Sequence, residues 1–175
     1  MGFRDWGSTP EERAQPYPCD RFVADPNLVL FRAVDVAADP PVLFRWLCQL
    51  KAAPYSWDWL DNFGRRSPRT RDPANEQLAL GDRIMTIFEL VDFERDRQLT
   101  AVLDKTRLFS DLASTYAIRP LYDGNSRWVV KIVTRLPVWS PLRLLLPAGD
   151  AFMMAKQMRT LKALAEADQR DSRRR

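Results

Sequence analysis

Aromatic and charged side chains concentrate in residues 53–68 (APYSWDWLDNFGRRSP). These sixteen positions hold four aromatic residues, two carboxylates, an amide and two arginines, and no other stretch is as rich in groups that can bind or react. If residues 55–63 form a short helix, Asp58 and Asp61 lie three positions apart on one side of it. The sequence therefore predicts a ligand-binding site in this stretch. Its candidate residues are Tyr55, Trp57, Asp58, Trp59, Asp61, Asn62 and Arg65.

The same residues also have structural interpretations. The carboxylate of Asp61 or the amide of Asn62 could pair with Arg65 or Arg66 and fix the loop, instead of holding a polar group of a ligand. The aromatic rings could cover a core instead of stacking on a ligand. Both interpretations stay open at the level of the sequence.

A candidate catalytic carboxylate outside this stretch is Glu89. Strict alternation over residues 83–93 places it on a strand face with apolar neighbours. Such surroundings favour the protonated form of a carboxyl group, which could then act as a general acid or base. Asp58 is the alternative carboxylate, and Tyr116 on a later strand could donate a hydrogen bond to a ligand carbonyl. The structural alternatives are an edge position or an ion pair for Glu89 and ordinary strand packing for Tyr116.

Histidine is absent from the chain. Its absence excludes every mechanism that needs an imidazole base and removes the commonest ligand of transition metals. The two cysteines, Cys19 and Cys48, form no CxxC pair and no metal-ligand spacing. We therefore expect no metal site and no cofactor. A disulfide between the two cysteines stays open, although a reduced, cytoplasmic chain is the better expectation.

Net charge limits the partners of the chain. The formal charge of its 175 residues is +4, and the last six residues contribute +3 of it, so the body is nearly neutral. A protein that reads nucleic acid usually carries a basic face on the fold itself, so we expect no nucleic acid partner. We expect no signal peptide in residues 1–20. Prolines and charges break the most hydrophobic stretch, 138–155, so we expect no stable membrane insertion.

The order of the predicted elements indicates an α+β domain. Apolar periodicity favours a strand, a helix that starts after Asp39, a second short helix, an antiparallel meander and a long C-terminal helix with Met154 and Met158 on its inner stripe. A curved sheet that wraps around a terminal helix leaves a wedge between them, and this wedge is a natural apolar pocket. The strands are predicted at 28–36, 83–93, 99–103, 111–121 and 127–136, and the helices at 40–50, 55–63 and 148–167.

The chain is expected to form one domain with extensions at both ends. Residues 1–27 are polar and proline-rich without periodicity, so we expect an irregular arm there. Residues 28–168 form the predicted ligand-binding domain, and residues 169–175 a basic, disordered tail.

Five sets of residues agree with one protein family. They are WGSTPEE at 6–12, PCD at 18–20, RAVDV at 32–36 with PP at 40–41 and WLCQL at 46–50, YSWDWLDN at 55–62, and KQMRTLKALA at 156–165. Together they resemble an uncharacterised actinobacterial branch of the SRPBCC, or START-like, superfamily, whose signature is YSxDxLDN and whose relatives include polyketide cyclases/dehydrases and lipid-transport proteins. In PCD, Cys19 replaces the usual glycine. The resemblance implies the helix-grip fold, in which a curved antiparallel sheet wraps around a long C-terminal helix.

Three functional hypotheses follow. The first is binding of a small hydrophobic or amphipathic molecule between sheet and helix, with Met154 and Met158 on the helix side. The second is a cyclase/dehydrase- or isomerase-type enzyme that uses Glu89 or Asp58 with Tyr116. The third is a partner-binding module whose pocket is filled by its own side chains. The superfamily includes lipid carriers, cyclases, hormone receptors and dioxygenase subunits, so the resemblance is not specific for one activity.

Overall fold

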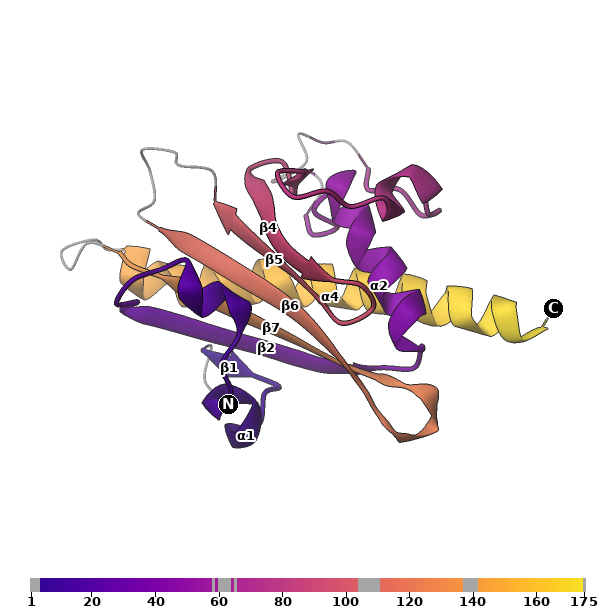
Figure 1. Ribbon diagram of the computed structural model, residues 1–175, viewed down its shortest axis with the longest axis horizontal. Helices are drawn as coiled ribbons and strands as arrows, with labels where there is room; N and C mark the ends of the chain where they lie inside the picture. Colours follow the sequence, from indigo (N-terminus) through magenta and orange to yellow (C-terminus); the bar gives the residue numbers. More distant parts are fainter. Residues whose placement is uncertain are drawn as a thin grey trace.

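One sheet of seven strands and a long helix form the body of the protein (Figure 1). The computed structural model describes residues 4–57, 59, 64, 66–103, 111–136 and 142–174, with the side chains of 142–146 excepted. The strand order is β1-β2-β7-β6-β5-β4-β3, and every neighbouring pair is antiparallel except β1 and β2. The strands are β1 (Asp5–Trp6), β2 (Leu28–Val36), β3 (Arg83–Ile84), β4 (Phe88–Glu94), β5 (Gln98–Leu103), β6 (Leu112–Pro120) and β7 (Ser126–Thr134).

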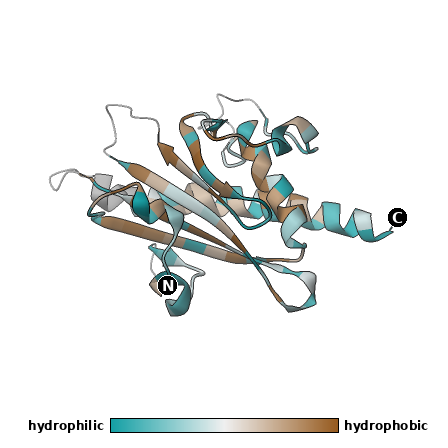
Figure 2. Cartoon of the chain, viewed as in Figure 1, coloured by the Kyte–Doolittle hydropathy of each residue, from teal (hydrophilic) through white to brown (hydrophobic). Residues whose placement is uncertain are grey.

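Helix α4 runs along one face of the sheet, and its C-terminal turns extend past the strands (Figure 1). These last turns are hydrophilic, whereas the strands are mainly hydrophobic (Figure 2). Helix α2 starts with two prolines in its first turn, where their missing N–H groups cost nothing, and it packs against α4. The helical elements are α1 (Pro10–Ala14), η1 (Pro18–Arg21), α2 (Pro40–Cys48), η2 (Gln49–Lys51), η3 (Pro73–Glu76), η4 (Tyr122–Gly124) and α4 (Leu142–Arg174).

The two faces of the sheet have separate hydrophobic clusters, as the two-residue side-chain period of a strand requires. The cluster on the face towards α4 includes Leu30, Leu43, Leu47, Trp128, Val130, Met158 and Leu161. The cluster on the opposite face includes Tyr17, Cys19, Val23, Phe31, Val129 and Val133. The cysteines are both free and buried, and they belong to different clusters, so they do not form a disulfide.

The N-terminal arm is not irregular, contrary to the sequence prediction. Strand β1 pairs in parallel with β2, and the Thr9 side chain caps α1 in a capping box with Glu12. Glu12 then accepts from the Arg127 Nε at 2.7 Å, and the Cys19 N–H donates to the Thr115 hydroxyl at 2.9 Å. Periodicity could not predict this order, because the arm is held by contacts to strands that lie about a hundred positions later in the chain.

Gly7 fixes the close approach of this arm to β2. Its φ is +75°, and a Cβ atom there would lie 2.1 Å from the carbonyl oxygen of Ala33. We expect Gly7→Ala to detach the arm from β2. The new Cβ atom would clash with the carbonyl oxygen of Ala33, and a residue with a side chain is strained at a positive φ. Limited proteolysis should then cleave residues 4–27 faster, and the free energy of unfolding should fall.

Gly81→Ala is the matched control for this prediction. Gly81 has a φ of +89° with no atom within 4 Å of the added Cβ, so it carries the strain without the clash. We expect a loss of about 1 kcal/mol for the control. Equal losses for the two variants would contradict a tight approach at Gly7.

Two predicted boundaries are wrong. Residues 83–93 do not form one strand, because Met85 and Thr86 have φ values of +48° and +72° and turn the chain between β3 and β4. The tail at 169–175 is helical up to Arg174, since Gln169 and Arg173 both contact the carboxylate of Asp39. Asp39 occupies the N-cap position of α2, as expected, but its side chain makes no capping hydrogen bond there.

The described residues contain neither a membrane-spanning helix nor a metal-binding cluster. None of the helices in those ranges combines the length and the hydrophobicity that a membrane crossing requires. Within the same ranges, no group of three or more His, Cys, Asp or Glu residues is placed to hold a metal ion.

Candidate functional site

Four polar side chains interrupt the apolar face of the sheet that lies under α4. Strand register places Arg32 and Tyr116 on either side of Val130 in one row across β2, β7 and β6. Ser114 lies opposite Ile132 in the next row, and Thr134 lies opposite Leu112 in the row after that. The four polar residues, Arg32, Ser114, Tyr116 and Thr134, are all at most 3% exposed. Buried polar groups need partners, so their surroundings indicate what this interior can bind.

Tyr116 belongs to a polar cluster with α4. Its hydroxyl donates to the Oε1 of Gln157 at 3.2 Å and lies 3.3 Å from the sulfur of Met85 and 3.9 Å from that of Met154. The Nε2 of Gln157 donates to the carbonyl oxygen of Pro54 at 2.7 Å. Burial raises the pKa of the Tyr116 phenol, so the hydroxyl keeps its proton and acts as a donor.

Arg32 and Asp150 form an ion pair between β2 and α4. The guanidinium Nη2 lies 2.6 Å from the Oδ2 of Asp150, and the Arg32 side chain is fully buried. The guanidinium also donates to the carbonyl oxygens of Arg4, Phe31 and Pro147. Burial raises the pKa of Asp150 to about 6, although the charge of Arg32 opposes this shift. The pair therefore joins the arm, the sheet and the first third of α4.

Among the described residues, four polar atoms on this face of the sheet have no hydrogen-bond partner. They are the hydroxyl oxygens of Ser114 and Thr134, the Nε of Arg32 and the Nε1 of Trp128. An unpaired buried polar group costs about 1–3 kcal/mol, so a folded protein usually supplies a partner or a bound molecule. Ser114 and Thr134 are diagonal neighbours on β6 and β7, in the two rows that follow the row of Arg32 and Tyr116. Together they could hydrogen-bond one polar group of a bound molecule.

The structure places three of the predicted binding residues in this interior. Tyr116 and Met154 are in contact, and Met158 is fully buried beside them in the same cluster. The segment at 53–57 meets this cluster through the bond from Gln157 to Pro54.

The predicted residues of the 55–65 stretch do not form one site. Tyr55 is buried edge-on against Trp46, with ring centroids 6.5 Å apart. Trp57 stacks on Phe152 of α4 at 4.8 Å, and Trp59 is 70% exposed. The predictions for Asp58, Asp61, Asn62 and Arg65 lie outside the described residues.

Glu89 is not inside an apolar face, and this prediction is wrong. Its side chain is exposed. Ile87, which directly precedes β4 and lies two residues before Glu89, is exposed as well. The inward face carries Phe88 and Leu90, and a bulge after Leu90 then moves Phe93 to that face. Alternation alone did not show which face of β4 is covered.

An open cleft of about 350 Å³ lies elsewhere, between α2, residues 69–73 and the C-terminal half of α4. Its described lining contains none of the predicted binding residues. Two of the lining residues, Arg71 and Asp168, form an ion pair with 2.7 Å between the Arg71 Nε and the Asp168 Oδ2. The described lining residues are Trp46, Arg69, Thr70, Arg71, Pro73, Leu164, Ala167, Asp168 and Asp171.

Comparisons with known proteins identify the fold. No family model matches the chain, and no curated protein matches it. Protein MLL2253 from Mesorhizobium loti superposes with a TM-score of 0.53 at 12% identity, over 79% of this chain and 97% of that one. A START superfamily protein from Mycobacterium smegmatis superposes with a TM-score of 0.51 at 16% identity, over 79% of this chain and 97% of its own. A Thermobifida fusca protein superposes with a TM-score of 0.51 at 17% identity, over 77% of this chain and 90% of its own. The chain therefore has the START-like α+β fold, with a mostly antiparallel sheet packed against a long C-terminal helix.

Proposed function

We propose that this protein binds a small hydrophobic or amphipathic molecule between the sheet and the N-terminal part of α4. The observation that carries the proposal is the pair of buried hydroxyls, Ser114 and Thr134, that have no partner among the described residues and lie on a mostly apolar surface. A ligand with one polar group and an apolar body fits these surroundings, because such sites are mostly apolar with a few polar contacts that fix orientation. The START-like fold supports this proposal but does not name the molecule.

Removal of the two hydroxyls should weaken ligand binding without loss of stability. In the double variant Ser114→Ala/Thr134→Val, we expect the dissociation constant of a bound fluorescent lipid analogue to rise about tenfold, since each lost hydrogen bond contributes about 0.5–1.5 kcal/mol. The free energy of unfolding of the ligand-free protein should stay constant or rise, because no internal hydrogen bond is broken. Titration by fluorescence and denaturation in urea measure the two quantities.

Thr100→Val is the matched control for the hydroxyl variants. The Thr100 hydroxyl is equally buried but lies 2.8 Å from that of Thr115 on the opposite face of the sheet. We expect this variant to lose stability and to keep its affinity. If the Ser114/Thr134 variant binds the analogue as the unaltered protein does, the hydroxyls do not contact the ligand.

One observation favours a different function, a partner-binding module with a filled pocket. Tyr116, Met154 and Gln157 already contact one another in the middle of the space between sheet and helix, so this part is occupied by the protein itself. Binding of no lipid analogue by a folded protein would favour this candidate over the first. The enzyme hypothesis loses Glu89, which is exposed, and Tyr116 alone offers only a donor.

A further inference from the structure

A cluster of aromatic and cationic side chains covers the outer side of α4. Trp57 stacks on Phe152 with ring planes 8° apart, and the Lys156 ammonium lies 5.5 Å from the centre of the Trp57 ring. Arg159 follows Lys156 by one helical turn on the same side. Trp59, two residues after Trp57, is 70% exposed. We call these five residues, Trp57, Trp59, Phe152, Lys156 and Arg159, the aromatic–cationic patch.

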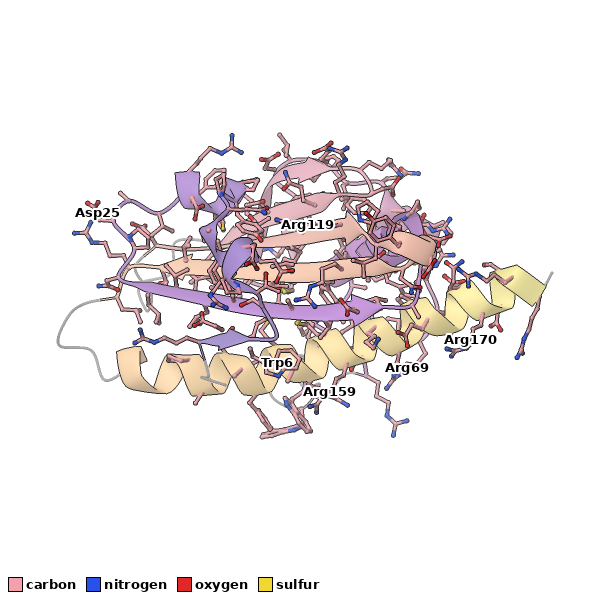
Figure 3. The ribbon with its side chains drawn as sticks, turned by 90° about the horizontal axis from the view of Figure 1, so that it is seen from below. Trp6, Asp25, Arg69, Arg119, Arg159 and Arg170 are labelled. Atoms are coloured by element: carbon pink, nitrogen blue, oxygen red, sulfur yellow. The ribbon has the colours of Figure 1, made fainter. Side chains whose placement is uncertain are left out.

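Three residues of the patch are exposed to solvent, and Trp57 and Lys156 are half-buried. Phe152 is 56% exposed, and Arg159 is exposed. Figure 3 shows Arg159 and Arg69 on the side of α4 that is turned away from the strands. Large aromatic side chains rarely gather on a free surface, because their exposure to water is unfavourable. Their grouping here indicates that something covers them.

The charge of the patch is unbalanced. Between Asp150 and Glu166, α4 carries three cations and no carboxylate. Lys162 pairs with Glu166, whereas Lys156 and Arg159 form no ion pair among the described residues. A surface with two cations that have no ion-pair partner among the described residues, beside exposed aromatic rings, is complementary to a negatively charged, partly apolar partner.

We propose that the aromatic–cationic patch docks the protein on the surface of an anionic lipid bilayer. Indole and phenyl rings lie favourably at the level of the lipid headgroups, and flanking lysine and arginine side chains bind anionic headgroups there. Long cationic side chains can pack their methylene stems beside the rings while the charges reach the phosphates. Docking of this kind places α4 parallel to the membrane surface without insertion. It does not require the bound molecule proposed above.

Vesicle co-sedimentation tests the proposal. We expect the full chain to bind vesicles of phosphatidylcholine with phosphatidylglycerol, to bind pure phosphatidylcholine vesicles much less, and to dissociate as salt rises. In Lys156→Gln/Arg159→Gln, the partition coefficient should fall about 25-fold, since each cation near an anionic surface contributes about fivefold. In Trp59→Ser/Phe152→Ser, which leaves the charge unchanged, it should fall about tenfold through lost apolar contact.

Arg95→Gln/Arg97→Gln is the control with the same change in net charge. Both arginines are exposed in the turn between β4 and β5, away from the patch. This variant should bind the anionic vesicles as the unaltered chain does, and thermal melting should show that all variants are folded. Three results would overturn the proposal: equal binding to both vesicle types, an equal loss in the control, or no vesicle binding. The last result would assign the patch to an acidic protein partner instead.

Discussion

Arg32→Met should lower the free energy of unfolding by about 3–5 kcal/mol at pH 7. The substitution removes the cation of a buried ion pair and leaves the Asp150 carboxylate without a partner, which is the costly way to break such a pair. It also removes the donors that hold the carbonyl oxygens of Arg4 and Pro147. Denaturation in urea, followed by circular dichroism, measures the loss.

The pH dependence of this variant has a defined sign. Burial already raises the pKa of Asp150 to about 6, and loss of Arg32 removes the charge that opposes this shift. The folded pKa then lies above the unfolded value, so the folded state takes up a proton more readily. Stability therefore rises as pH falls from about 7 through the folded pKa. A second substitution, Asp150→Leu, should restore stability at neutral pH and remove this slope.

Arg21→Met is the control for the ion pair. Arg21 contacts Asp92 at 2.5 Å, about the same distance as in the buried pair, but its side chain is 67% exposed. We expect a loss of less than about 1 kcal/mol, because water replaces the partner. If Arg32→Met costs no more than this control, the interior pair does not hold β2 to α4.

Gln157→Leu should lower the free energy of unfolding by about 3 kcal/mol. The change removes the donor to the buried carbonyl oxygen of Pro54, and it leaves the hydroxyl of Tyr116 with only the weakly accepting sulfur atoms of Met85 and Met154. It also removes the hydrogen bond from α4 to the segment at 53–57, so amide hydrogen exchange in this segment should speed up more than exchange in β7.

A double-mutant cycle and a control on the same helix sharpen this prediction. Tyr116→Phe combined with Gln157→Leu should cost less than the sum of the two single changes, because the pair is then replaced by apolar groups. Gln169→Leu removes hydrogen bonds to the half-exposed Asp39, which water can replace, so we expect a loss below about 1 kcal/mol. Additive losses at Tyr116 and Gln157 would show that the two side chains act independently.

Local sequence signals predicted the elements better than the site. The terminal helix, most of the strands and the turn at 123–125 follow from periodicity and turn chemistry, and Asp123 has the expected positive φ of 72°. The resemblance to the START-like superfamily predicted the packing of sheet on helix, which the structural comparisons confirm.

The interior polar groups could not be predicted because their partners are distant in sequence. Arg32 lies in the predicted strand at 28–36, and nothing near it in the sequence indicates its partner Asp150, 118 positions away. The predicted terminal helix begins at 148, whereas α4 starts at Leu142 and contains Pro147. Ser114 and Thr134 gave no signal of a buried site, since serine and threonine are mostly exposed residues.

Native mass spectrometry of the chain, purified from the cell that naturally makes it, tests the central claim most directly. The account predicts a non-covalent adduct that disappears on denaturation and is reduced in Ser114→Ala/Thr134→Val. A folded chain that shows only the bare polypeptide mass, or an adduct that the double variant retains in full, would contradict a ligand held by these two hydroxyls beneath α4.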